Sequence, residues 1–279
     1  MTPLILVKAH AFGNDFLLLD ERQIDGAVDR PALARAVCER RRGIGADGLI
    51  IYRATQRGAS MRLLNADGSR SEVSGNGVRC LAAWLAKERR LAPGATVAIE
   101  TEAGVKRLVL LSQESGRLTF RAAMGHPEQI AKEHIDVRGV SVEAVTLRVG
   151  NPQCVVLGAV TTARLHSLAS ALAVHPRFPE GTNVELASVT SPDRIDILIW
   201  ERGVGPTEAS GTGACAAAVA AASYGGAARD VQVVSPGGAQ RVEWTDEGVF
   251  LTGWAELIAE ARWLVRVTDG RVIDGQVIE

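Results

Sequence analysis

The sequence has few aromatic residues and no excess of charge, and both scarcities exclude classes of protein. Aromatic residues make up 4% of the 279 positions and are not interleaved with basic residues. The 31 Lys and Arg residues against 32 Asp and Glu residues leave a formal net charge of −1. No broad basic surface is therefore available to attract nucleic acid or anionic lipid. We expect neither a nucleic-acid partner nor a membrane partner.

Long hydrophobic runs and closely spaced cysteines are also absent. The first apolar run, Leu4 to Val7, ends at Lys8 and is much shorter than a signal-peptide core or a membrane span. We therefore expect a cytoplasmic protein. Four cysteines are too few and too far apart for a zinc site or a disulfide scaffold. We expect no metal site and four buried free thiols, namely Cys38, Cys80, Cys154 and Cys215.

The main positive feature is a motif that occurs twice. Residues 72–77 and 208–213 both read Glu-x-Ser-Gly-x-Gly, and the two serines, Ser74 and Ser210, lie 136 positions apart. Each copy precedes a run rich in Ala, Leu and Val, as expected for the start of a helix. Unpaired backbone N–H groups and the macrodipole stabilise an anion at such a position. Two copies in 279 residues indicate a duplicated fold with two matching anion sites.

Other landmarks repeat at nearly the same spacing. Gly13-Asn14-Asp15 and Gly150-Asn151-Pro152 each lie between two predicted strands, and Asn65 and Glu201 each lie nine residues before a motif serine. We predict an α+β fold of two pseudo-symmetric halves, each a curved, mostly antiparallel sheet wrapped around a central helix. The expected bounds are 1–125 and 126–265, with a tail from about 266 to 279 returning to the first half and a linker at 126–133. Helices are expected near 31–41, 77–90, 161–173 and 215–222.

Two helix starts that face one substrate predict a particular chemistry. Together they would hold a carboxylate, while one side chain at each start reaches the substrate from an opposite face. Inversion of a carbon centre needs one group that removes a proton from one face and another that delivers a proton to the other. This reaction needs no cofactor, and we expect none. The expected site lies at the interface of the halves.

The motifs together resemble the diaminopimelate epimerase family over nearly the whole chain. The resemblance implies a cofactor-independent amino-acid epimerase of the lysine and peptidoglycan precursor pathway, with an amino acid as its small-molecule substrate. It implies that asparagine and arginine side chains bind the distal carboxylate, that a glutamate binds the distal ammonium, and that backbone N–H groups bind the carboxylate next to the reacting carbon. The residues at these positions are Asn14, Asn65, Gly75, Asn76, Asn151, Asn183, Glu201, Arg202, Gly211 and Thr212. The oligomeric state is left open, with a homodimer as one option.

The sequence departs from the family where the proton is transferred. Family members use two cysteines there, and this chain has Ser74 and Ser210. A thiol has a pKa of about 8.5, while an alcohol lies nearer the ~15.7 of water. Forming the anion therefore costs roughly 10 kcal/mol more, at ~1.36 kcal/mol per pKa unit. A helix N-terminus returns only about 0.3–2 kcal/mol of this.

Other residues could supply a base or reshape the pocket. Glu72 and Glu208 precede the serines by two positions and are either bases or carboxylate caps of the helix starts. His10 and His126 are further candidates if the fold places them beside a serine. Gly48 and Gln153 stand where some family members carry Gln and His.

Three interpretations therefore remain open. The chain is a diaminopimelate epimerase with a natural or substituted serine pair, or a related racemase or dehydratase for another amino acid. Alternatively, it is a catalytically silent amino-acid-binding homologue.

Overall fold

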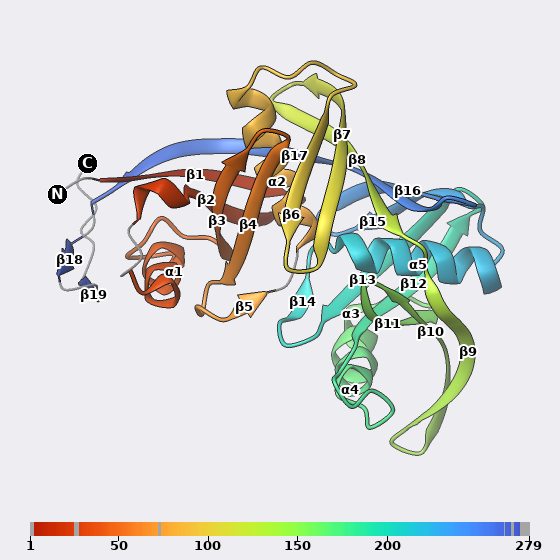
Figure 1. Cartoon of the computed structure of the whole chain (residues 1–279). Coiled ribbons are helices and arrows are strands. Elements are labelled where there is room, and N and C mark those ends of the chain that lie inside the picture. The colour runs from red at the N-terminus through yellow and green to blue at the C-terminus, as the bar shows by residue number, and fades with distance from the viewer. Residues whose placement is uncertain (1–2, 25–27, 72–73, 265, 269–270, 274–279) are drawn as a thin grey trace. The chain divides into compact units, whose positions relative to one another are not determined.

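The chain forms two compact units. The first comprises Met1–Phe120 and Trp254–Glu279, and the second comprises Arg121–Gly253. A computed structural model describes residues 3–24, 28–71, 74–264, 266–268 and 271–273 (Figure 1). Glu72 of the first motif lies outside the described residues, as do parts of the expected C-terminal tail.

Unit 1 is a sheet with two α-helices. Its elements are β1 (Leu4–Ala11), β2 (Asn14–Asp20), a short 3-10 turn (Glu21–Gln23), α1 (Arg30–Cys38), β3 (Gly48–Thr55), β4 (Gly58–Asn65), β5 (Arg70–Ser71), α2 (Gly75–Glu88), β6 (Thr96–Thr101) and β7 (Gly104–Glu114). β1 and β2 are antiparallel, β2 and β3 parallel, and β3 and β4 antiparallel. β4 then pairs parallel with β6, which pairs antiparallel with β7.

Unit 2 repeats this order of elements. It contains β9 (Glu128–Val137), β10 (Val140–Val149), β11 (Asn151–Leu157), α3 (Thr162–Arg164), a π turn (Leu165–Ala169), α4 (Ser170–Ala173), β12 (Asn183–Ser191), β13 (Arg194–Glu201), β14 (Gly205–Thr207), α5 (Gly211–Tyr224), β15 (Asp230–Ser235) and β16 (Gly238–Thr245). β10 and β11 are antiparallel, β11 and β12 parallel, and β12 and β13 antiparallel. β13 pairs parallel with β15, which pairs antiparallel with β16. The pairings of β10 to β16 thus match those of β1 to β7.

Two long strands cross the boundaries between the units. β8 (Arg117–Gly125) and β17 (Gly248–Trp263) each have residues in both. Within unit 1, β17 pairs antiparallel with β1. A small hairpin of β18 (Arg266–Thr268) and β19 (Arg271–Ile273) follows.

A buried helix occupies the core of each unit. α5 is built mainly from alanine, and ten of its residues are buried, since a helix without a polar face cannot lie at the surface. Its side chains pack with those of β10, β11, β13, β15 and β16. α2 likewise buries ten residues in unit 1. The predicted fold, a sheet around a central helix in each half, is confirmed.

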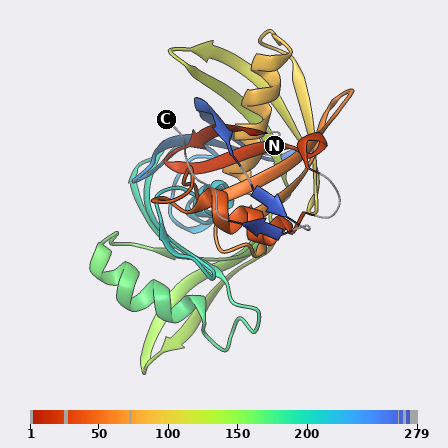
Figure 2. The same cartoon turned by 90° about the vertical axis from the view of Figure 1, so that its left-hand side faces the viewer.

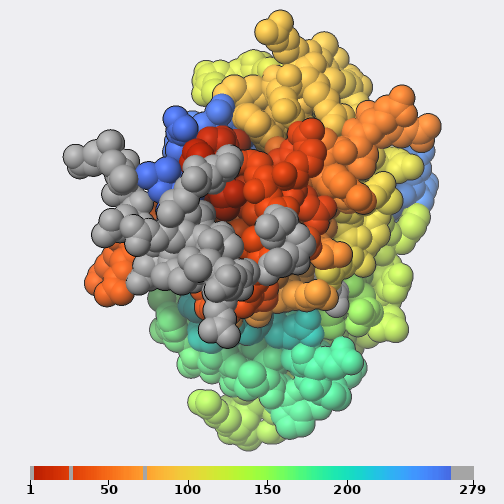
Figure 3. All heavy atoms as spheres, turned by 60° about the vertical axis from the view of Figure 1, so that its left-hand side comes forward, coloured from red at the N-terminus to blue at the C-terminus, as the bar shows by residue number. Residues whose placement is uncertain are grey.

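A second helical layer covers the other face of each sheet. In unit 2, residues 162–173 form one helical run, seen in Figure 2, that packs on β9 to β12 through Leu165, Leu172 and their neighbours. In unit 1, α1 packs through Leu33 and Val37 on β1 to β4. Figure 3 shows a side of the molecule on which residues of unit 1, coloured red to gold, lie at the surface.

Some sequence predictions of local structure were wrong. The linker expected at 126–133 is mostly strand, because β9 begins at Glu128. The strands expected at 249–252 and 255–267 are joined from 249 to 263 in one continuous strand, β17, and residues 266 and 267 belong to β18. Both central helices begin directly after the motif serine, so α2 starts two residues earlier and α5 four residues earlier than expected.

The two motif serines are the N-caps of these helices. Ser74 Oγ accepts a hydrogen bond from Gly77 N, and Ser210 Oγ accepts one from Gly213 N, both at 3.2 Å. Both residues have the extended backbone of an N-cap. The cap of α5 is therefore Ser210, not the carboxylate of Glu208, which is exposed.

We predict that Ser210→Ala lowers the free energy of unfolding by about 1 kcal/mol, because Gly213 N–H loses its acceptor at a buried helix start. The urea midpoint, followed by circular dichroism, measures this loss. The matched control is Ser167→Ala, which removes an exposed hydroxyl bonded to Ala163 O and should change stability little. Equal midpoints for both variants would contradict the role of Ser210 as a stabilising cap.

Candidate active site

In unit 1, the start of α2 lies beside the start of β2. Asn76, in the first turn of α2, donates from Nδ2 to Asn14 Oδ1 at 3.3 Å. Arg79, one helical turn further on and 1% exposed, donates from Nη2 to Asn76 Oδ1. A buried cation thus adds to the positive end of the α2 dipole. The half-buried Ser74 and two predicted binding residues, Asn14 and Asn76, therefore share one end of the unit.

A charged cluster fixes the other side of Asn14. Its Nδ2 donates to Asp47 Oδ2 at 2.8 Å, and the same oxygen accepts from Asp15 N at 3.1 Å. Arg40 Nη2 contacts both Asp15 Oδ1 and Asp47 Oδ1 at 2.8 Å. Because Asn14 accepts through Oδ1 and donates through Nδ2, its amide has a single orientation in this network.

Asp15 holds this cluster as a carboxylate. Burial alone would raise the pKa of Asp15, but hydrogen bonds from Arg40 and Lys8, and their positive charges, outweigh burial and lower the pKa below its ordinary value. The Lys8 Nζ to Asp15 Oδ2 distance is 3.1 Å. The ionised form of Asp15 is therefore the one that the fold stabilises.

The strand register places Asn65 at the same edge of the sheet. Phe16 of β2 pairs with Gly48 of β3, which pairs with Asn65 of β4. Asn65 Nδ2 donates to Ser69 Oγ at 2.9 Å, which holds the side chain on its own turn. No side chain at Gly48 separates Asn65 from β2.

In unit 2, the start of α5 carries the second serine. Ser210 is 5% exposed. Its Oγ lies 3.5 Å from Thr212 Oγ1. Gly211 and Thr212 provide first-turn N–H groups that have no acceptor within the helix. This end of α5 is therefore the counterpart of the α2 start.

The remaining predicted residues of unit 2 form a connected group. Gln153 pairs with Asn183 across β11 and β12, and its Nε2 donates to Asn151 Oδ1 at 2.6 Å. Asn183 Oδ1 accepts from Arg202 N at 2.9 Å. The guanidinium of the exposed Arg202 donates to Glu180 O at 2.8 Å. Glu201, half-buried, ends β13 directly before Arg202.

The structure also shows which candidate residues are not placed beside the serines. Among the residues that the structure describes, neither His10 nor His126 hydrogen-bonds to the serine of its own unit. His10 instead lies 3.7 Å from Glu256 and edge-on to Trp254. The four cysteines are buried and free, as predicted. Burial raises the pKa of Cys38 to about 12 and also raises that of Cys80, so neither thiol is activated.

Sequence reasoning missed the residues that support the candidate site. Asp47 and Arg79, which contact the predicted binding residues Asn14 and Asn76, are not among the residues predicted from the sequence. Glu185 was also missed, although a carboxylate between Val184 and Leu186 in an apolar strand is an unusual signal.

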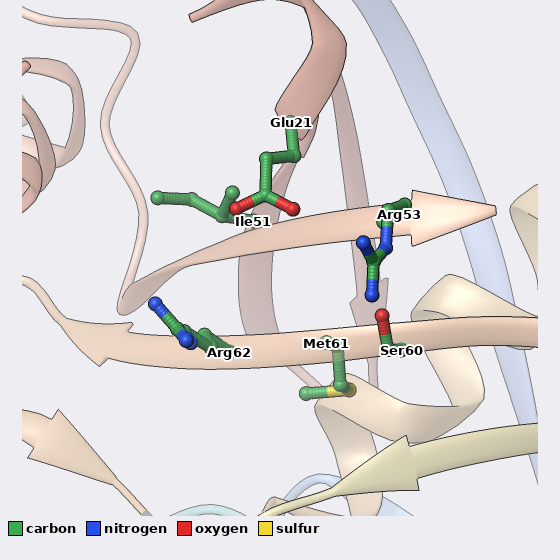
Figure 4. Close-up of a pocket in the computed structure, with 6 residues that line it drawn as sticks. All are labelled: Glu21, Ile51, Arg53, Ser60, Met61 and Arg62. Carbon is green, nitrogen blue, oxygen red and sulfur yellow. The ribbon is translucent and has the colours of Figure 1, made fainter. Parts of the chain in front are cut away.

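A cavity elsewhere in unit 1 contains none of the predicted residues. It has a volume of about 200 Å³ and is lined by Glu21, Ile51, Arg53, Ser60, Met61 and Arg62 (Figure 4). Its side chains come from β3, β4 and the 3-10 turn. We do not assign it to the chemistry at the helix starts.

Comparison with known proteins decides the family. The family model described as diaminopimelate epimerase matches residues 6–130 and 145–258. The chain belongs to the diaminopimelate epimerase family. A diaminopimelate epimerase of Desulforudis audaxviator is 39% identical over 275 residues, covering 92% of this chain and 98% of the relative. One of Moorella thermoacetica is 41% identical over 267 residues, covering 88% and 94%.

Solved structures share the fold of this diaminopimelate epimerase family member. A probable proline racemase of Agrobacterium radiobacter superposes with a TM-score of 0.69 at 16% identity, with 92% of each chain covered. A predicted epimerase of Pseudomonas aeruginosa gives a TM-score of 0.72 at 17% identity, with 95% of this chain and 100% of that one covered. At such low identity these likenesses concern the fold alone.

No described helix has both the length and the apolar character needed to cross a membrane. No group of three or more His, Cys, Asp or Glu side chains in the described ranges is arranged to hold a metal ion.

We predict that Asp15 makes unit 1 sensitive to acid. Its lowered pKa means that its contribution to stability is present above the ordinary value of about 3.9 and is lost as pH falls through the folded-state pKa. Urea midpoints measured from pH 6 downward should fall more steeply below about pH 4 for the wild type than for Asp15→Asn.

The control for this acid sensitivity is Asp246→Asn, which removes an exposed carboxylate 3.8 Å from Arg229. This variant should follow the wild-type curve. Parallel curves for the wild type and Asp15→Asn would contradict the assignment to Asp15.

Proposed function

We propose that the chain is a cofactor-independent epimerase that interconverts LL- and meso-diaminopimelate. Family membership over most of the chain supports the substrate. The observation that carries the proposal is the pair of buried helices whose N-caps are both serines with a following Gly-x-Gly. One such start in each unit matches a reaction that needs two proton-transfer groups.

Each helix start contributes to binding in this proposal. First-turn N–H groups at Gly75-Asn76 and Gly211-Thr212 bind the carboxylate next to the reacting carbon. Arg202 and the asparagines bind the distal carboxylate, because a guanidinium and amide N–H groups are suitable donors. Glu201 binds the distal ammonium. The asparagines are Asn14, Asn65, Asn151 and Asn183.

In this proposal, the two serines exchange protons with the substrate from opposite faces. One oxygen removes the proton from the α-carbon and leaves a carbanion, and the other hydroxyl delivers a proton to the opposite face. The backbone N–H groups at the helix starts stabilise the charge that develops on the carboxylate. A serine anion costs roughly 10 kcal/mol more than a thiolate at ~1.36 kcal/mol per pKa unit. Turnover is therefore slower with serine than with cysteine.

A second candidate is a catalytically silent amino-acid-binding protein on the same scaffold. The two serines favour it, because neither touches a histidine among the described contacts of its unit. It shares the binding residues with the epimerase and differs only in proton transfer. A test must therefore measure binding and exchange separately.

We predict that the protein binds LL-diaminopimelate and slowly incorporates deuterium at the α-carbon in deuterated water, with formation of the meso isomer. Ser74→Cys combined with Ser210→Cys should raise the rate at least 10²-fold, which recovers only part of the pKa difference. Calorimetry measures binding, and NMR measures deuterium and isomer. Binding without exchange, even in the double variant, would leave only the silent binding protein, and absence of binding would exclude both candidates.

We also predict that Asp47→Asn weakens the binding of diaminopimelate about tenfold, corresponding to ~1.4 kcal/mol. Asp47 accepts from Asn14 and pairs with Arg40, so its loss frees the Asn14 amide to rotate. The control is Asp193→Asn in unit 2, a carboxylate bonded to Ser191, which should not change the Kd. An unchanged Kd in Asp47→Asn would show that the cluster does not orient Asn14 for binding.

A further inference from the structure

Glu185 is a fully buried carboxyl group without a partner. It lies in β12 with an exposed fraction of 0%. Among the residues that the structure describes, neither Oε1 nor Oε2 has a hydrogen-bond partner. A buried polar group in this state is costly and needs an explanation.

This carboxyl group lies against the first turn of α5. A Cβ atom built on Gly213 would lie 2.7 Å from Glu185 Oε1 and 3.2 Å from Ser210 Cβ. Gly213 N is also the donor to Ser210 Oγ. Glu185 and Ser210 therefore pack on the same glycine, and a side chain at that position would displace the carboxyl group.

The duplicated fold shows that folding does not require this acid. β12 pairs with β11 through Asn183 and Gln153, as β3 pairs with β2 through Gly48 and Phe16. Glu185, two residues after Asn183, thus corresponds to Ile50, two residues after Gly48. A Cβ built on Gly77 of α2 would lie 3.0 Å from Ile50 Cδ1. The side chain that packs against the second motif glycine is therefore apolar in unit 1, where it is Ile50 at Gly77, and acidic in unit 2, where it is Glu185 at Gly213.

The surroundings keep Glu185 protonated in the resting protein. Burial, followed by the negative charge of Glu201, raises the pKa of Glu185 well above its ordinary value. The α5 N-terminus beside it would stabilise a transient carboxylate, since this end of the helix dipole is positive. Glu185 can therefore exist in both forms at this place.

We propose that Glu185 is the proton reservoir of Ser210. As the Ser210 Oγ–H bond breaks and a Cα–H bond forms on the substrate carbanion, the Glu185 O–H bond breaks and its proton moves to Oγ. The negative charge passes from carbon to the carboxylate, and the serine does not become an alkoxide. In the opposite direction, Glu185 first loses its proton to solvent; Oγ then takes the α-proton and gives its own proton to the Glu185 carboxylate.

Between turnovers, Glu185 exchanges its proton with solvent and returns to the resting form. The transfer requires a change of rotamer at Glu185 or Ser210, because Ser210 Oγ accepts from Gly213 N and the Glu185 carboxyl group has no described hydrogen-bond partner in the resting structure. Glu185 does not touch substrate and acts through Ser210, so it is a positioning and proton-holding residue. The inference rests on the proposed function.

The test compares wild type, Glu185→Gln and Glu185→Ile, which copies the counterpart Ile50. We expect both variants to fold, to bind diaminopimelate with an unchanged Kd, and to lose about 10²- to 10⁴-fold in kcat, the range of general acid–base catalysis. Glu185→Asp should recover part of this loss. The control is Glu143→Gln, which removes an exposed carboxylate 2.9 Å from Lys132 and should leave kcat unchanged.

Two further measurements separate proton transfer from a structural role. The Glu185→Gln loss should fall below tenfold in a Ser210→Cys background, because a thiol needs less help to carry charge. The infrared difference spectrum of wild type minus Glu185→Gln should contain the carbonyl band of a protonated carboxylic acid. The absence of this band would overturn the reservoir.

The kinetic outcomes are also distinct. Full kcat in Glu185→Gln, or an equal loss in the serine and cysteine backgrounds, would overturn the proposed reservoir alone. Binding without any turnover in the wild type would overturn the reservoir and leave binding intact. No binding of diaminopimelate by the wild type would overturn the proposed function itself.

Discussion

The structure depends on the burial of two helix N-termini, each of which must find partners for its first N–H groups. α2 and α5 are largely buried in their units, which limits the access of water to these N–H groups. Ser74 and Ser210 satisfy one N–H group each from within the chain. In the proposed function, the positive ends of the two helix dipoles stabilise the carboxylate of the substrate. The same constraint thus accounts for a stable core and for an anion site.

The two units use this arrangement with different supporting residues. In unit 1 the helix start is linked to β2 through Asn76 and Asn14, and Arg79 adds a buried positive charge. In unit 2 the corresponding helix has no such arginine in its first turns, because Ala214 and Cys215 follow Gly213. Its niche contains Glu185 instead. Duplication supplied a common backbone, and the side chains beneath the two serines then diverged.

How far the sequence predicts this molecule depends on the kind of signal. The repeated motif and its 136-residue spacing predicted two similar halves, because both helix starts need the same glycines and cap. The linker predicted at 126–133 is mostly part of β9, a strand in which most side chains are exposed. Backbone hydrogen bonds to β10 hold that strand in place. Its sequence therefore shows little of the hydrophobic alternation that predicts a strand. The Asp47 network was missed for a related reason. Asn14 bonds to Asp47, which is 33 positions away in sequence, and to Asn76, which is 62 positions away.

The exchange of cysteine for serine changes the task of the surrounding residues more than it changes the fold. A serine hydroxyl caps a helix well, so the scaffold keeps its stability. Its high pKa, however, makes a free alkoxide inaccessible at neutral pH, and a helix dipole cannot make up the difference. Chemistry at a serine is therefore easier when its proton can move as charge develops to a partner that lies close and is shielded from water. Glu185 meets both conditions beside Ser210, while the apolar Ile50 beneath Ser74 cannot accept or donate a proton.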